Sequence, residues 1–264
     1  MSRLYKRRCI VTIIAQNGIV VRIDKLRIQF KCQKDTKSDP NDAEISIYNL
    51  SEEKRALLAA KNTRVSLEVG YESGTGIIFI GDVTNVTPER VGVDTITKIE
   101  VRDGDNRFRN SRINASFGPG VTLNQVIDQL SSALGFPLKS KTGVPDVVFG
   151  KGVSISSAVK DALNSYTRPY DLEWSIQNET LQIGSKSGIL PDLPILLNAS
   201  SGLVGYPQKI KEGIEFSSLI QPDLQPGKKV VIESRFVNGF YKVQTVVHEG
   251  DNQTDTFLSN CEAT

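Results

Sequence analysis

One short stretch near the C-terminus places the only histidine of the chain beside acidic residues. His248 is followed directly by Glu249, with Asp251 two residues further on, in the segment FVNGFYKVQTVVHEGDN (residues 236–252). A histidine with nearby carboxylates is the combination used for general acid–base catalysis or for holding a divalent metal ion. The elements that carry these residues decide whether their side chains converge.

The pattern around His248 is that of a β-hairpin. Asn238–Gly239 predicts a two-residue turn, and the register that follows places Lys229 opposite His248 on a mainly polar face. Glu249 then points to the opposite face of the strand, and Asp251 lies in a GDN sequence typical of turns. The groups do not converge on one metal unless the strand bulges. We therefore expect a structural histidine, with no catalytic residue, metal site or cofactor.

The remaining motifs for enzymatic chemistry are missing or indistinct. The sequence has no P-loop, no G-x-G-x-x-G after a strand, no G-x-S-x-G and no H-E-x-x-H. One histidine leaves little scope for a serine or cysteine nucleophile with a histidine base. A hydrolase with two carboxylates stays open, because 30 acidic residues always offer pairs, although no pair is singled out by an apolar setting.

The cysteines and the short apolar runs argue against a disulfide-rich, zinc-binding, secreted or membrane-spanning protein. Cys9, Cys32 and Cys261 are odd in number and widely spaced, which speaks against a disulfide framework or a zinc site and suits a reducing compartment. The run CIVTIIA near the N-terminus reads as a strand, because it is short and lacks a small-residue cleavage site. No apolar run approaches the ~18 residues of a membrane span, so we expect no membrane insertion.

Basic residues are concentrated at the N-terminus. The net charge is +2, but residues 1–37 hold ten Lys and Arg against Asp24 and Asp35, a balance of +8 that leaves −6 for the rest. Lys25, Arg27 and Lys31 alternate with apolar residues, which predicts a half-buried strand with a basic outer row. The alternation favours an acidic partner or a solvated face over nucleic acid, and we take these three residues as a possible partner interface. No RRM, KH or zinc-finger motif is present, and an OB-like nucleic-acid-binding barrel stays open.

The hydrophobic periodicity predicts a mainly β chain with an α+β insert. Residues 1–118 read as strands with one short helix after Ser51, including a hairpin at Asn17–Gly18, as in a small barrel. Beyond FGPG at 117–120 the period becomes helical. The expected elements are a helix capped by Thr122 and Gln125 and stopped at Gly135, a second helix over 154–166, and a hairpin turning at Asn178–Glu179. A proline-spaced connector closes this α+β domain (119–200), and 201–264 returns to strands.

The C-terminal segments SLIQPDLQPG, VNGFYKV and HEGD, closing with the CEA strand, resemble the hub proteins of bacteriophage tail baseplates, the late control protein D and tail-hub family. The N-terminal AEISIYNLS, VSLEVGY and IIFIGDVTNV are similar to the first barrel of such hubs. The resemblance implies a structural virion protein with two β-barrel-like tube domains, 1–118 and 201–264, and a small α+β domain. It implies no enzyme, since fused cell-wall hydrolases of some members have no counterpart here.

The resemblance also implies partners. The hub would be a homotrimer in the virion tail, assembled in the host cytoplasm, that adapts a six-fold tail tube to a three-fold central spike. The tail tube protein, the spike, and other baseplate and tape-measure proteins would be its neighbours, and DNA would pass through the lumen without specific binding. A cell-wall hydrolase of the tail tip and an OB-like nucleic-acid binder are the alternatives.

Overall fold

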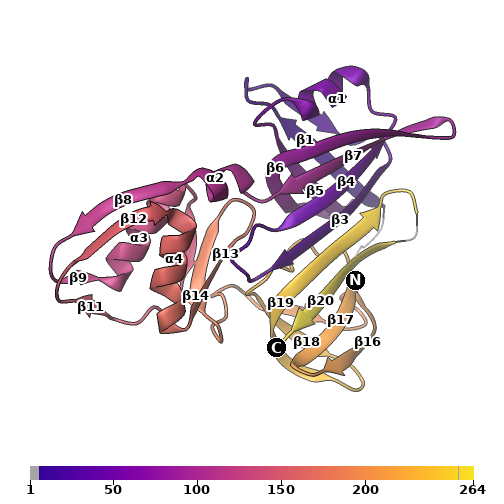
Figure 1. Ribbon diagram of the computed structural model, residues 1–264. Coiled ribbons are helices and arrows are strands. Elements are labelled where there is room, and N and C mark those ends of the chain that lie inside the picture. Colours follow the sequence, from indigo (N-terminus) through magenta and orange to yellow (C-terminus); the bar gives the residue numbers. More distant parts are fainter. Residues whose placement is uncertain (1–5, 255) are drawn as a thin grey trace. The chain divides into compact units, whose positions relative to one another are not determined.

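The computed structural model describes residues 6–254 and 256–264, and the fold is mainly β with a smaller α+β part (Figure 1). The chain divides into two compact units. Unit 1 combines Met1–Asp35, Asn41–Asp103 and Pro191–Thr264, and unit 2 combines Thr36–Pro40 with Gly104–Leu190. Segments from the two ends of the sequence thus share one unit.

The N-terminal module of unit 1 begins with the expected hairpin. The amide of Ala15 donates to the carbonyl of Ile19, and Gly18 supplies the positive φ of 83° that the loop needs. The module comprises β1 (Arg7–Ile14), β2 (Val20–Ile23), β3 (Ile28–Asp35), β4 (Asp42–Tyr48), α1 (Glu52–Ala59), β5 (Arg64–Tyr71), β6 (Gly74–Val91) and β7 (Asp94–Arg102).

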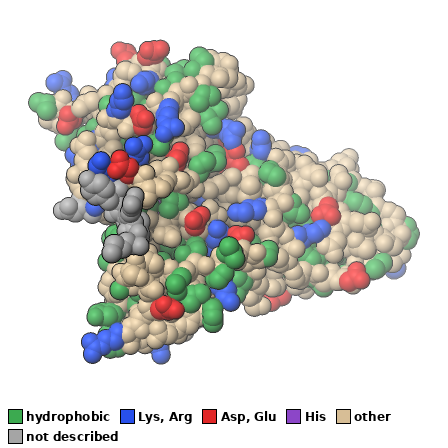
Figure 2. Space-filling model, turned by 180° about the vertical axis from the view of Figure 1, so that it is seen from behind, with side chains coloured by type: hydrophobic (Ala, Val, Ile, Leu, Met, Phe, Trp, Pro, Cys, Tyr) green, Lys and Arg blue, Asp and Glu red, His purple; other side chains and the backbone are tan. Residues whose placement is uncertain are grey.

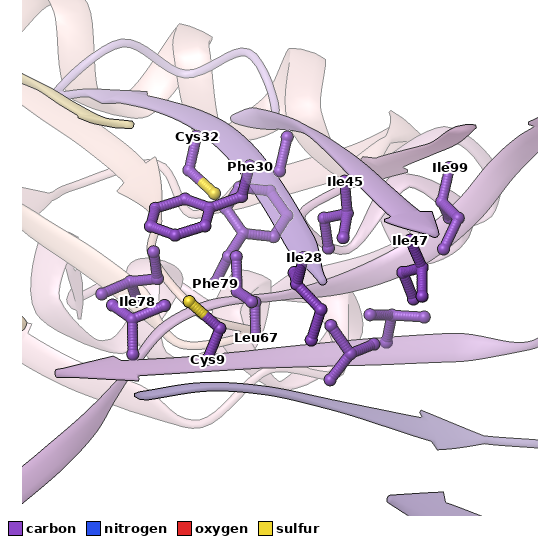
Figure 3. Close-up of a cluster of buried hydrophobic side chains, with 14 of the residues drawn as sticks. Cys9, Ile28, Phe30, Cys32, Ile45, Ile47, Leu67, Ile78, Phe79 and Ile99 are labelled. Atoms are coloured by element: carbon purple, nitrogen blue, oxygen red, sulfur yellow. The ribbon is translucent and has the colours of Figure 1, made fainter. Parts of the chain in front are cut away.

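The core of this module is built from one face of each strand (Figure 3). Ile28, Phe30 and Cys32 of β3 point into it and Lys31 stays exposed, which confirms the alternation predicted for this strand. Apolar side chains of β4, β5, β6 and β7 complete the cluster, among them Ile45, Ile47, Leu67, Ile78, Phe79 and Ile99.

The C-terminal module of unit 1 has its own core, which includes Leu197, Phe216, Ile232, Val243 and Cys261. Its strands are β15 (Ile195–Leu197), β16 (Leu203–Ile210), β17 (Gly213–Leu219), β18 (Lys229–Glu233), β19 (Asn238–Asp251) and β20 (Phe257–Ala263). β15 belongs to the proline-spaced connector and pairs in parallel with β18.

One continuous sheet joins the two modules. β19 pairs antiparallel with β3, from Thr245 opposite Asp35 to Asp251 opposite Gln29. The strand order is β16-β17-β20-β19-β3-β4-β7-β6-β5-β1-β2. We call the β3–β19 ladder the internal joint, and Figure 1 shows these two strands side by side.

Unit 2 is the α+β part. Its main helix has the predicted capping box between Thr122 and Gln125 and ends at Gly135, whose φ is 82°. The hairpin turn at Asn178–Glu179 is also confirmed, with positive φ at both residues. The elements are α2 (Asp105–Asn110), β8 (Arg112–Phe117), β9 (Val121–Thr122), α3 (Leu123–Leu134), β10 (Leu138–Lys141), β11 (Val148–Phe149), β12 (Val153–Ala158), α4 (Val159–Thr167), a 3₁₀ turn (Arg168–Tyr170), β13 (Leu172–Ile176) and β14 (Leu181–Ser185).

Strand pairing changes two boundaries. The second helix begins at Val159 and not at Ser154, because Val153–Ala158 pairs with β8 as a strand. The same pairing draws β8 into unit 2, although its residues were expected to end the first barrel. In the described part of the chain, no helix has the length and apolar character of a bilayer span.

The β18–β19 hairpin closes differently from the prediction. A four-residue loop, Ser234–Val237, replaces the turn expected at Asn238–Gly239. Within it the Ser234 amide and hydroxyl donate to the Val237 carbonyl, at 3.2 and 2.7 Å. Asn238 already belongs to β19, opposite Glu233, and its side-chain oxygen accepts from the Ser234 amide at 2.9 Å. The side-chain bonds of this loop therefore set a register that dipeptide preference does not.

Candidate assembly interface

His248 lies in the interior of unit 1, only 1% exposed, and the face shown in Figure 2 displays no histidine surface. With the loop at Ser234–Val237, Lys229 pairs with Lys242, and His248 lies between Cys32 of β3 and Ser259 of β20. The prediction that His248 occupies a polar face opposite Lys229 is therefore wrong.

The chemistry around His248 is that of a neutral buried imidazole. Its Nδ1 is 2.9 Å from the hydroxyl of Ser259. Burial lowers the pKa of His248 to about 3, with a smaller effect in the same direction from the charge of Lys34 and an opposite one from the backbone of Leu224. Glu249 points away and accepts a hydrogen bond from Asn260 at 3.0 Å. The histidine and the glutamate form no catalytic pair.

Lys34 is the second unexpected polar group in the interior. It continues the inward row of Ile28, Phe30 and Cys32 on β3 and is 1% exposed. Its ammonium donates to the carbonyl of Ile78 at 3.0 Å and lies 5.8 Å from the ring of Phe79. A buried lysine needs such partners, because an uncompensated charge in a core is costly.

Asp251 closes one end of the internal joint. Its Oδ2 accepts from Nη2 and Nε of Arg27, at 2.7 and 3.0 Å, and from Nε2 of Gln29 at 2.8 Å. Burial alone would raise the pKa of Asp251, but the hydrogen bonds from Arg27, the Gln253 amide and Gln29 hold it below its ordinary value. The Asp251 side chain is 4% exposed and that of Arg27 30%, so this ion pair is largely shielded from water.

Asn252 extends this arrangement to the backbone. Its Oδ1 accepts from the amide of Ile28 at 3.0 Å, and its Nδ2 donates to the carbonyl of Leu26 at 2.8 Å. Asp251 and Asn252, the DN of the GDN sequence, thus hold the start of β3. We call the contacts of Arg27 and Gln29 with Asp251, together with those of Asn252, the latch.

The three basic residues singled out as a possible partner interface lie in different settings. Arg27 binds Asp251 of its own chain, which raises the pKa of Arg27. Lys31 is exposed and lies opposite Glu44 on β4 and Glu249 on β19. Lys25 is exposed, just before β3.

The exposed face of the continuous sheet is acidic overall. One row runs from Glu249 through Lys31 and Glu44 to Glu100. The side chains on this face alternate with those of the two cores, and carboxylates outnumber cations there. From β17 to β6, and apart from Asp251 with its partner Arg27, the acidic members are Asp35, Asp42, Glu44, Asp82, Glu89, Glu100, Glu215, Glu249 and Glu262, and the basic ones are Lys31, Lys98 and Arg102.

The strands at the open edges carry exposed apolar groups. Tyr206 of β16, 60% exposed, stacks edge-on against Phe236, 64% exposed, with ring centroids 5.0 Å apart. Val204, Ile210 and Val91 are also exposed. Such clusters on a sheet edge are typical of surfaces that bind another protein.

Metal chemistry has no support in the described residues, where no group of three or more His, Cys, Asp and Glu side chains is placed to hold an ion. The three cysteines are buried and unpaired. Burial raises the pKa of the Cys9 thiol to about 12 and raises those of Cys32 and Cys261 as well.

Sequence reasoning missed the latch and Lys34. The pairing of β3 with β19 joins segments more than 200 residues apart, and nothing local signals it. The alternation on β3 does extend to Lys34, so this residue could have been placed inside. The GDN sequence was predicted to be a turn, but Gly250 and Asp251 belong to β19, and the residues at Leu26–Ile28 that this segment contacts carry no matching signal.

Comparison with known proteins identifies the family. A model of the family "Baseplate hub gp41" matches residues 9–263. The chain belongs to the baseplate hub gp41 family. It is therefore a structural protein of a bacteriophage tail, as the sequence resemblance implied, and its place is the virion tail.

Solved structures show the same fold at low sequence identity. The 43 kDa tail protein of prophage MuSo2 from Shewanella oneidensis is similar with a TM-score of 0.66 and 9% identity, covering 98% of each chain. The tail protein from Neisseria meningitidis MC58 has a TM-score of 0.65 and 9% identity, covering 97% of this chain and 96% of the other. Escherichia coli c3393, a component of the type VI secretion system, has a TM-score of 0.60 and 11% identity, covering 90% and 73%. No curated protein sequence matches this hub.

Proposed function

We propose that the chain forms a homotrimeric ring that adapts the six-fold tail tube to a three-fold central spike and forms part of the tail conduit. The observation that carries the proposal is the internal joint, which fuses two β modules edge to edge in one chain. Three such chains supply six modules, the number needed to match a six-fold tube. A ring of one kind of chain thereby matches both the six-fold tube and the three-fold spike, without needing a second protein.

The modules have separate roles in this proposal. The N-terminal and C-terminal modules, expected at 1–118 and 201–264, act as tube domains against the tail tube protein and the spike. The α+β part within 119–200 binds neighbouring baseplate and tape-measure proteins. Assembly takes place in the host cytoplasm, in keeping with three unpaired cysteines among the described residues.

The electrostatics of the sheet support a conduit. Its exposed face is acidic overall, and a wall of carboxylates repels the phosphates of passing DNA. Lys25, Arg27 and Lys31 face acidic groups in this proposal and not DNA: Asp251 and Glu44 of the same chain for two of them, and another baseplate protein for Lys25. DNA passes through without specific binding.

The hub acts without enzymatic activity in this proposal. His248, the one histidine of the sequence, is buried and neutral, and Glu249 is bound to Asn260. Cleavage of the cell wall belongs to another tail protein.

Negative-stain images and native mass of the purified chain test this function. The expected particle is a ring with three-fold symmetry, a central hole and three times the mass of the 29.0 kDa chain. A chain that stays monomeric at every soluble concentration contradicts it. Zymography on peptidoglycan and a salt-titrated DNA shift separate the alternatives, since clearing supports a hydrolase and tight, salt-sensitive binding supports a nucleic-acid binder.

A further inference from the structure

The two β modules of unit 1 repeat one another in chain order. β6 pairs with β5 along its first half and with β7 along its second, and β19 does the same with β18 and β20. Both long strands shift register where the second half begins, after Val83 and after Val243. The amides of these valines donate to the carbonyls of Thr63 and Lys228, and both bonds are 2.9 Å long.

The paired side chains fix the alignment of the repeat. Glu44 of β4 lies opposite Glu100 of β7, and Glu215 of β17 lies opposite Glu262 of β20. β4 and β7 therefore correspond to β17 and β20, and their outer neighbours β3 and β6 correspond to β16 and β19.

The corresponding strands differ in what covers their edges. The second half of β19 lies between β20 and β3. Residues 85–91 of β6 pair with β7 on one side, and no other described strand pairs with their second edge, because β5 reaches only residues 74–82. Among the described strands, β16, the counterpart of β3, pairs with β17 alone. The open strands are therefore the counterparts of the two strands in the internal joint.

We infer that residues 85–91 of β6 in one copy pair antiparallel with β16 of the next copy, in the register of the internal joint. The inference rests on the proposed ring and assigns the strands that close it. The contact is heterologous, since each copy offers β6 to one neighbour and β16 to the other, and contacts of this kind form a ring when the rotation between copies closes.

The register follows from the repeat. Val247 lies opposite Gln33 in the internal joint. When the two modules are aligned, Thr87 of β6 corresponds to Val247 of β19, and Ile210 of β16 corresponds to Gln33 of β3. Thr87 of one copy therefore lies opposite Ile210 of the next. The same transfer places Val91 opposite Val204.

The side chains suit this pairing. Val91 is 50% exposed and Val204 40%, so their contact removes apolar surface of both from water. Thr87 and Ile210 are both exposed and β-branched, and such side chains pack well across strands.

The open strands differ from the internal joint in two respects. Pro88 and Pro207 each remove one backbone donor, as on edge strands protected from indiscriminate pairing. Val91 holds the place of Asp251, so no latch forms between copies. The joint between copies is therefore weaker than the internal one, and assembly depends on concentration.

A disulfide cross-link tests the register. Thr87→Cys and Ile210→Cys are introduced together, and the three native thiols stay out of the reaction because they are buried. Oxidation is expected to give covalent trimers on a non-reducing gel. The matched control is Thr87→Cys with Val204→Cys, both at exposed positions. In the proposed register these two positions are about four residues, roughly 13 Å, apart along the strands, so their thiols cannot form a disulfide and we expect monomers.

The other outcomes overturn the inference in distinguishable ways. Covalent dimers from Thr87→Cys alone or Ile210→Cys alone mean that like strands pair with like. Failure of the Thr87→Cys/Ile210→Cys pair to cross-link in a preparation of trimeric native mass contradicts this joint and leaves the proposed ring standing. A monomeric native mass overturns both.

Discussion

At the scale of single residues, the segment around His248 works through burial and hydrogen bonding. His248 is hydrogen-bonded to the hydroxyl of Ser259 and feels the charge of Lys34. Asp251 and Asn252 bind the first residues of β3 and those just before it. Buried polar groups need hydrogen-bond partners, and Arg27, Gln29 and Ile28, which supply several of them, lie more than 200 residues from this segment.

The first prediction concerns the pH dependence that His248 imposes. Its pKa is about 3 in the folded chain and about 6.5 in an unfolded one, so the unfolded state binds the extra proton between these values. The contribution of the neutral His248 to the free energy of unfolding is therefore fully present above pH 6.5. It falls as the pH drops towards 3, by about 1.4 kcal/mol per pH unit. We expect urea unfolding of His248→Gln to show a slope between pH 6 and pH 4 that is shallower by this amount.

Ser259→Ala is the matched control for the histidine. It removes the hydrogen bond to Nδ1 and keeps the titrating ring, so stability falls at every pH while the slope stays. Equal slopes in the wild-type and His248→Gln chains would show that another group carries the acid sensitivity.

The second prediction concerns the latch. Asp251→Ala leaves the donors of Arg27 and Gln29 without their acceptor, and we expect the free energy of unfolding at pH 7 to fall by about 2 kcal/mol. Because the pKa of Asp251 is lowered, this stabilisation is present above about pH 4 and is lost below it. Chemical denaturation of both chains measures the difference.

An exposed ion pair of similar length is the control. Lys98 and Glu89 are 2.5 Å apart, with side chains 56% and 49% exposed, and Glu89→Ala is expected to cost no more than about 1 kcal/mol. Equal losses for Asp251→Ala and Glu89→Ala would mean that the latch contributes no more than a surface contact.

At the scale of elements, sequence motifs correctly predicted the turns and helix ends that are fixed by hydrogen bonds between residues close in sequence. The capping box of α3, the hairpin at Gly18 and the turn at Asn178–Glu179 follow from nearby residues and are present. The start of α4 and the loop at Ser234–Val237 depend on a distant strand and on side-chain bonds, and both were predicted wrongly. The internal joint, where the candidate site lies, pairs distant segments, and no periodicity within either strand encodes its partner.

The third prediction concerns the fit of β19 against β3. A Cβ at Gly250 would lie 2.6 Å from Cδ2 of Phe257 and 2.9 Å from Cζ of Phe30, and both rings are buried. We expect Gly250→Ala to lower the free energy of unfolding by about 1–3 kcal/mol, because the rings cannot yield without disturbing the core.

Gly74→Ala is the matched control, since a Cβ at Gly74 meets nothing within 4 Å. Its effect is expected to stay within about 0.5 kcal/mol. Full stability of Gly250→Ala in thermal or urea unfolding would contradict the close packing of the internal joint.

At the scale of the whole molecule, the repeated modules explain why one chain suits a hub. The internal joint fuses one pair of strands, and their counterparts in β6 and β16 are left open for another copy. The sequence alone predicted a mainly β chain and resembled tail hubs. The β–αβ–β order suggested a structural repeat, but no repeat is evident in the sequence itself, because what the two modules share is strand order, register shifts and a few paired glutamates.

A cryo-electron microscopy map of the assembled particle, resolved well enough to trace strands, tests the ring and its joints most directly. We expect three copies in a closed ring, with β16 of each copy hydrogen-bonded to residues 85–91 of β6 in its neighbour and Thr87 opposite Ile210. A map in which β16 and the second half of β6 both face solvent, or in which like strands pair, would contradict this arrangement.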